Sequence, residues 1–395
     1  MPRSLTIRCQ ARALRCQTQT LRTRALRCQA RTLRCQTRAL WCQARALARA
    51  LRCQTRRPRC QARPLAFAAL LAAGTAVAAD HYSAREIPGL GGGQVFGNGL
   101  GEQGQVVGES TSPADSITHA FATGPDGVGV VDLCPADATY CSASAINRQG
   151  RVIGAYAGHS AGASIGFVAD VDGGRFHRVA GILDPRVWYV QLNGLNDRGQ
   201  IVGYSTGHGA MRGWVTGADG RPVVDFGDYT GEDVRSLAIA IDDGGGVLAF
   251  VQRAPGIQYL SDHGRSRRTL PGLDSNAAFF APDGAIAGSG PSGTGADHAL
   301  YLPPPWSTAV DLGTLGGDRS QTMGVASGGR VVGFSTDASG QPRAFVYDPD
   351  HGMRDLNGLV DLPAGVVANY GRAINERGQI VVSDGFRTWL LTPDD

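Results

Sequence analysis

The chain has 395 residues, 56 of them glycine, and its 38 basic residues are all arginine, which excludes a P-loop lysine, a Schiff-base lysine and a pyridoxal attachment site. Its formal charge of +4 is unevenly distributed, because residues 1–64 hold 17 arginines and no acid. From Asp80 onward, 21 arginines face 34 acidic residues, a formal charge of −13, which argues against nucleic acid and anionic membranes as partners.

Residues 1–64 form a low-complexity segment rich in arginine, cysteine and glutamine, in which units such as Ala25–Gln29 and Thr32–Gln36 recur at a step of seven. Leucine and cysteine lie two residues apart in each unit, which makes no continuous apolar face on a helix. A basic metal-binding or membrane segment is the functional alternative. We interpret the segment as a dispensable leader, disordered or upstream of the true translation start.

Residues 56–78 have the three parts of a secretory signal peptide. They begin with several arginines, continue in an apolar run as far as Val77, and end in small residues that predict cleavage after Ala78. The run is too short and too rich in alanine for a comfortable membrane span. The sequence therefore predicts a secreted or periplasmic protein whose mature chain begins near Asp80.

Residues 80–395 carry seven copies of one unit, which align on a turn glycine at spacings of 39 to 49 residues. These glycines are Gly104, Gly150, Gly199, Gly245, Gly284, Gly329 and Gly378. An apolar residue lies four positions before each glycine, a small residue precedes it in six of seven copies, and valine or isoleucine follows two positions after the glycine. This pattern predicts a strand, a tight turn and a second strand.

A third strand follows in each copy, as at His119–Phe121, and a fourth strand follows a second turn, as at Val310–Leu312. Four short strands in a unit of this length are typical of a β-propeller blade. The last copy stops after its third strand, and residues 85–92 echo the fourth-strand segment 310–317. We therefore predict an all-β, seven-bladed β-propeller whose N-terminal strand completes the last blade and removes an exposed edge. A β-solenoid or a ring of six or eight blades is the alternative.

The strand His119–Phe121, the run Asp311–Gly317 and the turn-strand Ala145–Gly154 resemble the HAF repeat family of bacterial extracellular repeat proteins. The resemblance covers nearly all of the chain after the signal peptide, although the copies at Ile241–Ala249 and Phe280–Gly288 are degenerate. It implies an extracellular location and a repeat architecture, and it implies no established activity.

Catalytic and metal motifs are weak throughout the chain. Gly203–Gly207 matches the G-x-S-x-G nucleophile elbow, but that elbow needs a strand-to-helix turn and here the repeat places the serine inside a strand. Asp170–Gly174 hints at calcium, for which six or more oxygens are needed, so we favour a solvated Asp-Gly turn and leave calcium open. The eight histidines show no metal-ligand spacing. We predict no catalytic residue, no metal and no cofactor.

Cys134 and Cys141 are the only cysteines that remain after signal cleavage, and six residues separate them. An oxidising compartment favours a local disulfide between them. Free thiols and a redox role are the alternatives.

The second-to-third and fourth-to-first connections share one end of the predicted ring and are longer and more variable than the other turns. Variable loops on a rigid scaffold commonly carry binding sites. The predicted ligand-binding residues on these loops are Trp188, Tyr189, Tyr229, Arg235, Arg319 and Tyr370. A structural alternative is that Trp188 and Tyr189 cap the core between two blades.

Three functions stay open on the sequence alone. The first is a monomeric binding or interaction module, not an enzyme, for a carbohydrate, a peptide or a cell-surface polymer. The second is a polysaccharide hydrolase or lyase that uses carboxylates such as Asp228, Asp233 and Asp318. The third is a structural cell-envelope protein.

Overall fold

The computed structural model describes residues 81–158, 164–179, 189–207, 210–217, 222–225, 235–252, 254–261, 266–274, 278–293 and 295–394. All of them belong to the second of two compact units, Gly74–Asp395. The predicted leader, the signal peptide and the cleavage site after Ala78 lie outside the described residues. Within them, nearly all regular structure is β-strand. Short 3-10 turns occur at η1 (Pro125–Gly127), η3 (Ser327–Gly329) and η4 (Leu356–Gly358).

The described strands form seven four-stranded antiparallel sheets, one for each sequence repeat. Blade 1 contains β2 (Val95–Leu100), β3 (Val106–Thr111), β4 (Thr118–Ala122) and β5 (Val131–Asp132). Blade 2 contains β6 (Ala138–Ile146), β7 (Arg151–Gly158), β8 (Ser164–Asp170) and β9 (His177–Val179). Blade 3 contains β10 (Tyr189–Leu195), β11 (Ile201–Gly207), β12 (Ala210–Thr216) and β13 (Pro222–Asp225).

Blade 4 contains β14 (Ser236–Ile241), β15 (Val247–Val251), β16 (Ile257–Ser261) and β17 (Ser266–Thr269). Blade 5 contains β18 (Ala278–Phe280), β19 (Ile286–Pro291), β20 (Asp297–Leu302) and β21 (Val310–Asp311). Blade 6 contains β22 (Gly316–Ala326), β23 (Arg330–Asp337), β24 (Pro342–Asp348) and β25 (Gly352–Asp355). Blade 7 contains β26 (Tyr370–Ile374), β27 (Ile380–Ser383), β28 (Thr388–Pro393) and β1 (Tyr82–Glu86).

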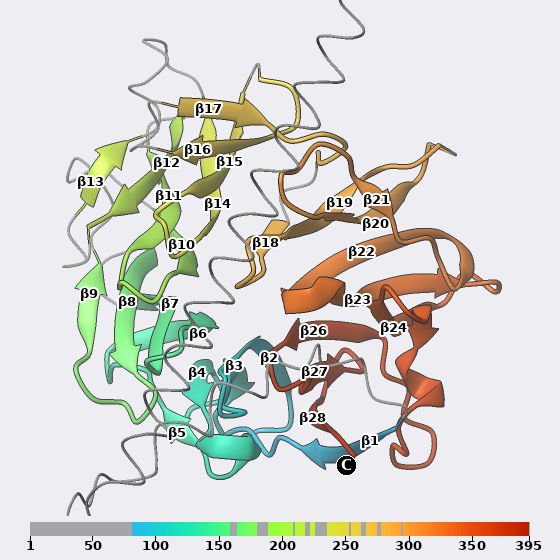
Figure 1. Cartoon of the computed structure of the whole chain (residues 1–395). Helices are drawn as coiled ribbons and strands as arrows, with labels where there is room; N and C mark the ends of the chain where they lie inside the picture. The colour runs from blue at the N-terminus through green and yellow to red at the C-terminus, as the bar shows by residue number, and fades with distance from the viewer. Residues whose placement is uncertain are drawn as a thin grey trace, which may run out of the picture. The chain divides into compact units, whose positions relative to one another are not determined.

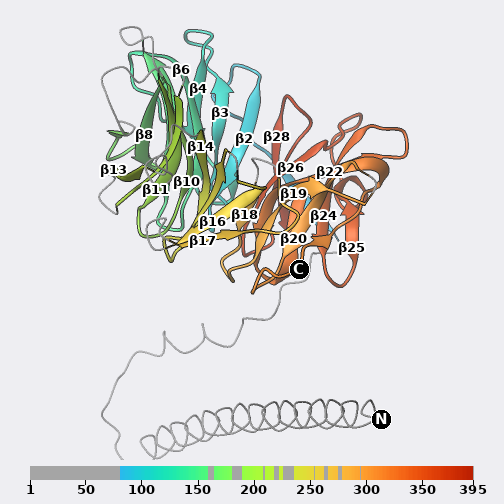
Figure 2. The same ribbon diagram turned by 90° about the horizontal axis from the view of Figure 1, so that it is seen from above.

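The blades follow one another around a ring, with the first strand of each repeat nearest the centre (Figure 1). Each inner strand contacts the inner strand of the next blade, and β26 of blade 7 contacts β2 of blade 1. Turned by 90°, the blades stand face against face (Figure 2). The seven-bladed β-propeller predicted from the repeats is therefore confirmed, and the solenoid alternative is excluded because the ring closes.

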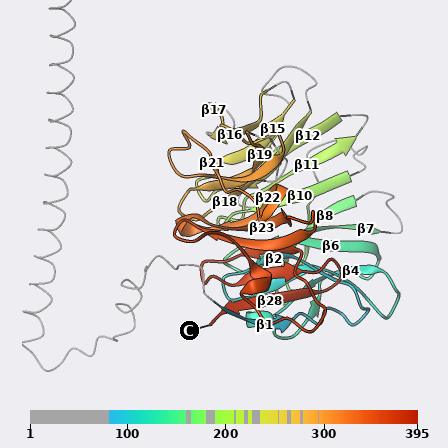
Figure 3. The same ribbon diagram turned by 90° about the vertical axis from the view of Figure 1, so that its right-hand side faces the viewer.

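The ring closes through the N-terminal strand, as predicted. β1 pairs antiparallel with β28 and lies beside it in two views (Figures 1 and 3). Glu86 pairs with Trp389 at the register position where Asp311 pairs with Leu300 in blade 5. The strand is shorter than the sequence echo over residues 85–92, because it ends at Glu86. Pro88 has no N–H for a sheet ladder and Gly89 has a φ of 54°, so the backbone leaves the sheet there.

The hydrophobic core is divided into seven clusters, and each cluster lies between two adjacent blades. Ile153 and Val168 of blade 2, for example, pack with Leu192 and Trp214 of blade 3. The same arrangement occurs at the other six seams. Each blade is therefore stabilised by apolar burial against both neighbours, as in other repeat proteins.

The small residue of the repeat lies where inner strands approach one another most closely. A Cβ on Gly99 would lie 3.3 Å from the Cα of Ala145 in the next blade, and a Cβ on Gly194 would lie 3.2 Å from the Cα of Ala240. These are contacts between small residues at the same repeat position of adjacent blades. The recurrent glycine or alanine is therefore explained by crowding around the axis of the ring.

Candidate functional site

Four of the six predicted ligand-binding residues are described, and all four lie at one end of the ring, where the inner strands begin. We call this the loop end, because the second-to-third and fourth-to-first connections reach it; the opposite end is the turn end. The four residues are Tyr189 and Tyr370, which begin β10 and β26, Arg235, which precedes β14, and Arg319 in β22. Trp188 and Tyr229 lie outside the described residues.

Tyr140 and Glu109 form the centre of an aromatic surface at the loop end. The Tyr140 hydroxyl donates to Glu109 Oε2 across 2.7 Å, which links blade 2 to blade 1. Partial burial and the neighbouring Glu109 carboxylate raise the pKa of Tyr140 to about 12. The phenol therefore stays a hydrogen-bond donor at every physiological pH, while 45% of Tyr140 is exposed.

Tyr189 and Tyr204 continue this surface on blade 3. Their ring centroids are 5.9 Å apart, and the Tyr189 hydroxyl donates to Gln191 Oε1 across 2.7 Å. Burial and Tyr189 raise the pKa of Tyr204 to about 12. Tyr189 is 39% exposed and is not part of the apolar cluster between blades 2 and 3. Its ring therefore faces solvent beside a second tyrosine.

On the other side of Glu109, the surface continues over blades 7 and 6. The Arg372 guanidinium lies over the Tyr370 ring, with 5.0 Å from Cζ to the centroid, and Tyr370 meets Phe334 edge to face at 5.6 Å. Burial lowers the pKa of Arg372. The neighbouring Tyr370 and Glu109 act in the opposite direction and raise it, but by less. Arg372 thus stacks on Tyr370 and lies within reach of the charge of Glu109 on the neighbouring blade.

We call this surface the tyrosine band. It consists of Phe334, Tyr370, Arg372, Glu109, Tyr140, Tyr189 and Tyr204 and spans five consecutive blades of the ring. Of the predicted ligand-binding residues, the structure brings Tyr189 and Tyr370 into the band. Arg235 and Arg319 are exposed on blades 4 and 6 and are not among the residues of the band.

Sequence reasoning did not select Glu109, Tyr204 or Phe334. They occupy one repeat position, five residues after the turn glycine, in the middle of the second strand. The recurrence of a charged or aromatic residue at one strand position indicates that this position forms a surface of its own. The repeat itself makes no demand on the side chain at this position, so the residue type there reflects something other than the fold.

The turn end contains a cavity of about 480 Å³, lined by the first turns of the blades. Several acids line it, and four of them lie two residues before the turn glycine: Glu102, Asp197, Asp243 and Glu376. Burial and the charge of Glu376 raise the pKa of Glu102. Sequence analysis did not identify this cavity, although the recurrence of acids at one turn position indicated it.

The acids at the turn end already have partners in the fold. The Arg148 guanidinium pairs with both Asp197 and Asp243. Backbone N–H groups of neighbouring turns donate to the same carboxylates, as from Arg148 to Asp197 Oδ1 across 3.0 Å and from Glu376 to Glu102 Oε2 across 3.2 Å. These contacts satisfy turn N–H groups and join the blades, so they give the acids a structural role.

The motifs with catalytic appearance are also explained by the fold. Ser205, the serine of the G-x-S-x-G match, is buried and its Oγ accepts a hydrogen bond from Trp214 Nε1 across 2.9 Å. Asp318 is exposed and accepts from the Thr336 hydroxyl, while Asp228 and Asp233 lie outside the described residues. Asp170 of the Asp-Gly turn pairs with Arg175 and Arg151, which leaves it poorly suited to calcium.

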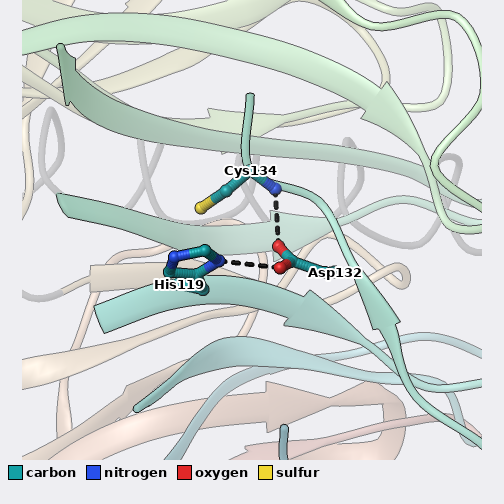
Figure 4. A group of neighbouring side chains, drawn as sticks. All are labelled: His119, Asp132 and Cys134. Carbon is teal, nitrogen blue, oxygen red and sulfur yellow. Dashed lines mark hydrogen bonds and ion pairs between the residues drawn. The ribbon is translucent and has the colours of Figure 1, made fainter. Parts of the chain in front are cut away.

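His119, Asp132 and Cys134 form a further cluster at the seam between blades 1 and 2 (Figure 4). His119 Nδ1 lies 2.7 Å from Asp132 Oδ2, and its Nε2 lies 3.0 Å from Asp115 Oδ2. The structure pairs Cys134 with Cys141 as a disulfide, with 6.1 Å between the Cα atoms, inside the usual range for such bonds. The spacing of these residues along the sequence did not predict the cluster.

The fold and these surfaces define the chain as a seven-bladed β-propeller. No family model matches the chain and no curated protein matches it, so the resemblance to the HAF repeat family stays a prediction. Among the described residues, no helix has the length and apolar character to cross a membrane.

Solved structures match the chain at low identity. An oligogalacturonate lyase from Vibrio parahaemolyticus matches at 10% identity and a TM-score of 0.51, over 76% of this chain and 89% of its own. An oligogalacturonate lyase in complex with manganese matches at 12% identity and 0.50, over 74% and 86%. TolB from Acinetobacter baumannii matches at 13% identity and 0.43, over 74% of this chain and 64% of its own. At such identities the likeness to the two lyases concerns the fold alone.

Proposed function

We propose that the protein is an exported binding module and that the tyrosine band at the loop end is its ligand-binding surface. The observation that carries this proposal is the pair Tyr140 and Tyr189. Large apolar or aromatic side chains are rarely exposed in the described residues, and these two lie on adjacent blades at the same end of the ring. Exposed, clustered aromatic residues on a rigid scaffold are typical of binding surfaces.

The chemistry of the band favours a polysaccharide as the ligand. A sugar ring has an apolar face of C–H groups and a rim of hydroxyls. Tyrosine offers a flat ring with a hydroxyl at its edge, and the band adds the Glu109 carboxylate and the Arg372 guanidinium. The succession of tyrosines over several blades suits a chain of sugar units. A peptide ligand is an alternative outcome of the test below.

The test measures binding of the exported protein to a polysaccharide array, followed by affinity measurements on the best ligand. We expect Tyr189→Ala and Tyr140→Ala each to weaken binding about tenfold, the loss of about 1.4 kcal/mol. Tyr140→Phe keeps the ring and removes the hydrogen bond to Glu109, so its effect isolates the contribution of that contact. Val128→Ala is the control, because Val128 is also exposed but lies beside the third-to-fourth turn of blade 1.

Each result has a distinct meaning. Tight binding that the tyrosine variants weaken and the control does not supports the proposal. Release of reducing ends from the bound polysaccharide supports the hydrolase or lyase alternative instead. Binding to a peptide array alone identifies a peptide ligand, and the absence of any binding leaves the structural envelope protein. Mass spectrometry of the same exported sample tests export, with an N-terminus expected near Ala79 or Asp80.

A further inference from the structure

The seam between blades 1 and 2 brings together four side chains that are typical ligands of a transition metal. His119 lies in β4, Asp132 ends β5, Cys134 follows it, and Cys141 lies in β6 of the next blade. Ligand atoms of His119, Asp132 and Cys134 all lie within 4.8 Å of one another, and the side chains converge (Figure 4). Cys141 adds a second sulfur, which the disulfide holds beside that of Cys134.

The equivalent seam between blades 5 and 6 has no cysteines and can be compared directly. His298 and Asp311 occupy the repeat positions of His119 and Asp132, and His298 Nδ1 lies 2.9 Å from Asp311 Oδ1. Gly313 then replaces Cys134, and Ser320 replaces Cys141. The histidine-aspartate pair is therefore a feature of the repeat, and the two cysteines are additions to it.

The two seams differ in one hydrogen bond and share another. The Ala299 N–H donates across 2.9 Å to Ser320 Oγ, at the repeat position of Cys141, whereas the Ala120 N–H at the equivalent position points to Cys134 Sγ across 3.2 Å. The Gly313 N–H donates to Asp311 Oδ1 as the Cys134 N–H donates to Asp132 Oδ1. The seam between blades 5 and 6 thus forms without a disulfide and keeps the aspartate-to-backbone bond, so we expect reduction to leave the fold intact.

We propose that reduction of the Cys134–Cys141 disulfide creates a Zn²⁺ site formed by the two cysteine thiolates, His119 and Asp132. Zinc prefers four ligands drawn from thiolate, imidazole and carboxylate groups. In the oxidised protein the sulfurs are bonded to each other and are not thiolates, so the site exists only after reduction. The redox state of the seam therefore decides whether the metal binds.

The chemical steps balance with an external thiol or phosphine as the reductant. The disulfide accepts two electrons and two protons and becomes two thiols, while a dithiol reductant becomes a disulfide. Binding of Zn²⁺ then releases the two thiol protons, so affinity falls at low pH. A metal-bound imidazole usually has its other nitrogen hydrogen bonded to a carboxylate, and Asp115 holds His119 Nε2 in this way.

The test uses the exported protein and Co²⁺, a spectroscopic substitute for Zn²⁺. After reduction with a phosphine under anaerobic conditions, we expect one Co²⁺ to bind, with thiolate-to-cobalt charge transfer and the visible bands of a tetrahedral site. Zn²⁺ should displace it. His119→Ala should weaken binding at least about tenfold. His298→Ala is the matched control, because it removes the equivalent histidine from the seam that has no cysteines.

A second variant separates loss of the site from loss of the fold. Cys134→Gly with Cys141→Ser restores the residues of the blade 5 seam, so it should fold and lack the charge-transfer band. Metal bound elsewhere is shared by all variants and cancels in the comparison. The proposal is overturned if the reduced protein, shown to be folded by circular dichroism, gives no charge-transfer band, or if His119→Ala and His298→Ala bind cobalt equally.

Discussion

At the residue scale, one asparagine of the repeat both closes its own turn and joins the next blade. Asn196 Oδ1 accepts from the N–H groups of Arg198 and Gln200, and its Nδ2 donates to the Asp242 carbonyl of blade 4 across 2.9 Å. Asn147 and Asn375 make the same contacts to their neighbours. Aspartate at this position accepts equally well but has no donor for the next blade.

We therefore predict that Asn196→Ala lowers the free energy of unfolding by about 2–3 kcal/mol, because it removes the turn contacts and the link between blades. Asn196→Asp keeps the turn acceptor and should cost about 1–2 kcal/mol through the lost donor. Urea denaturation measures both. Arg198→Ala, an exposed change in the same turn, should stay within about 0.5 kcal/mol. If Asn196→Asp were as stable as the unchanged protein, the hydrogen bond donated by Asn196 Nδ2 would contribute nothing to stability.

A second prediction at this scale concerns Tyr259, whose hydroxyl donates to Asp242 Oδ2 across 3.2 Å. Burial and the Asp242 carboxylate raise the pKa of Tyr259 to about 12. The protonated phenol is therefore favoured in the folded state. Its contribution to stability is complete below the ordinary pKa of about 10 and is lost as the pH rises toward 12.

Spectrophotometric titration of phenolate absorbance in the folded protein, compared with Tyr259→Phe, measures this group by difference. The difference should appear near pH 12. A difference that develops near pH 10 would show that Tyr259 is not held by Asp242. Tyr140 and Tyr204 titrate in the same high range, so the Tyr259 signal must come from the subtraction and not from the total absorbance.

At the element scale, six of the seven inner strands share one irregularity that the sequence pattern contains but does not explain. Register shifts occur between Gly97 and Gly99 in β2, between Ala143 and Ala145 in β6, and at the same place in β10, β14, β22 and β26. The extra residue is a β-bulge. In blade 1 it is Asn98, whose Nδ2 donates to the Ala143 carbonyl of blade 2 across 3.0 Å.

Opposite the bulge, the second strand needs glycine in several blades. A Cβ on Gly108 would lie 1.9 Å from the Phe96 carbonyl oxygen, and a Cβ on Gly333 would lie 1.9 Å from that of Gln321. These backbone atoms cannot move away cheaply. The recurrent glycine of the second strand, which the sequence showed only as part of a motif, therefore follows from the bulge.

The Cys134–Cys141 pair joins the end of blade 1 to the first strand of blade 2, and its oxidation is testable. We predict that alkylation of the exported protein without reductant labels neither cysteine. Because the closed loop is short, replacing the pair by glycine and serine should cost at most about 2–3 kcal/mol. Labelling of both residues in the unreduced protein would refute the disulfide and would leave the thiols free to bind a metal.

At the scale of the whole molecule, stability depends on closing the ring with β1. Tyr82 and Ile87 are fully buried, Tyr82 between blades 6 and 7 and Ile87 between blades 7 and 1. A chain that begins at Gly93 loses both residues and exposes the edge of β28. The lost burial alone amounts to about 3–6 kcal/mol.

We therefore expect the chain that begins at Gly93 to melt roughly 10 °C lower than one that begins at Asp80, or to aggregate through the open edge. The two chains differ only in the closing segment, so each is the control for the other. Thermal unfolding followed by circular dichroism gives the comparison. Equal melting temperatures would show that β1 adds nothing to the stability of the ring.

The sequence by itself determined the all-β class, the seven blades and the closure by the N-terminal strand. These features follow from local patterns that repeat: hydrophobic alternation, turn glycines at regular spacing, and an echo of one strand at the opposite end of the chain. Because every copy has the same pattern, the fold could be predicted even though some copies, such as the one at Phe280–Gly288, are degenerate.

Only the tertiary structure decided which side chains meet. Glu109 and Tyr140 lie on adjacent blades, and Arg372 reaches the same surface from blade 7 because the ring closes. His119 approaches Cys134 through the pairing of β4 with β5. Such contacts depend on the angle and register between blades, which packing at the seams determines. The spacing of residues along the chain does not determine that angle. The sequence therefore predicted that the binding residues lie at the loop end, but not which of them form the tyrosine band.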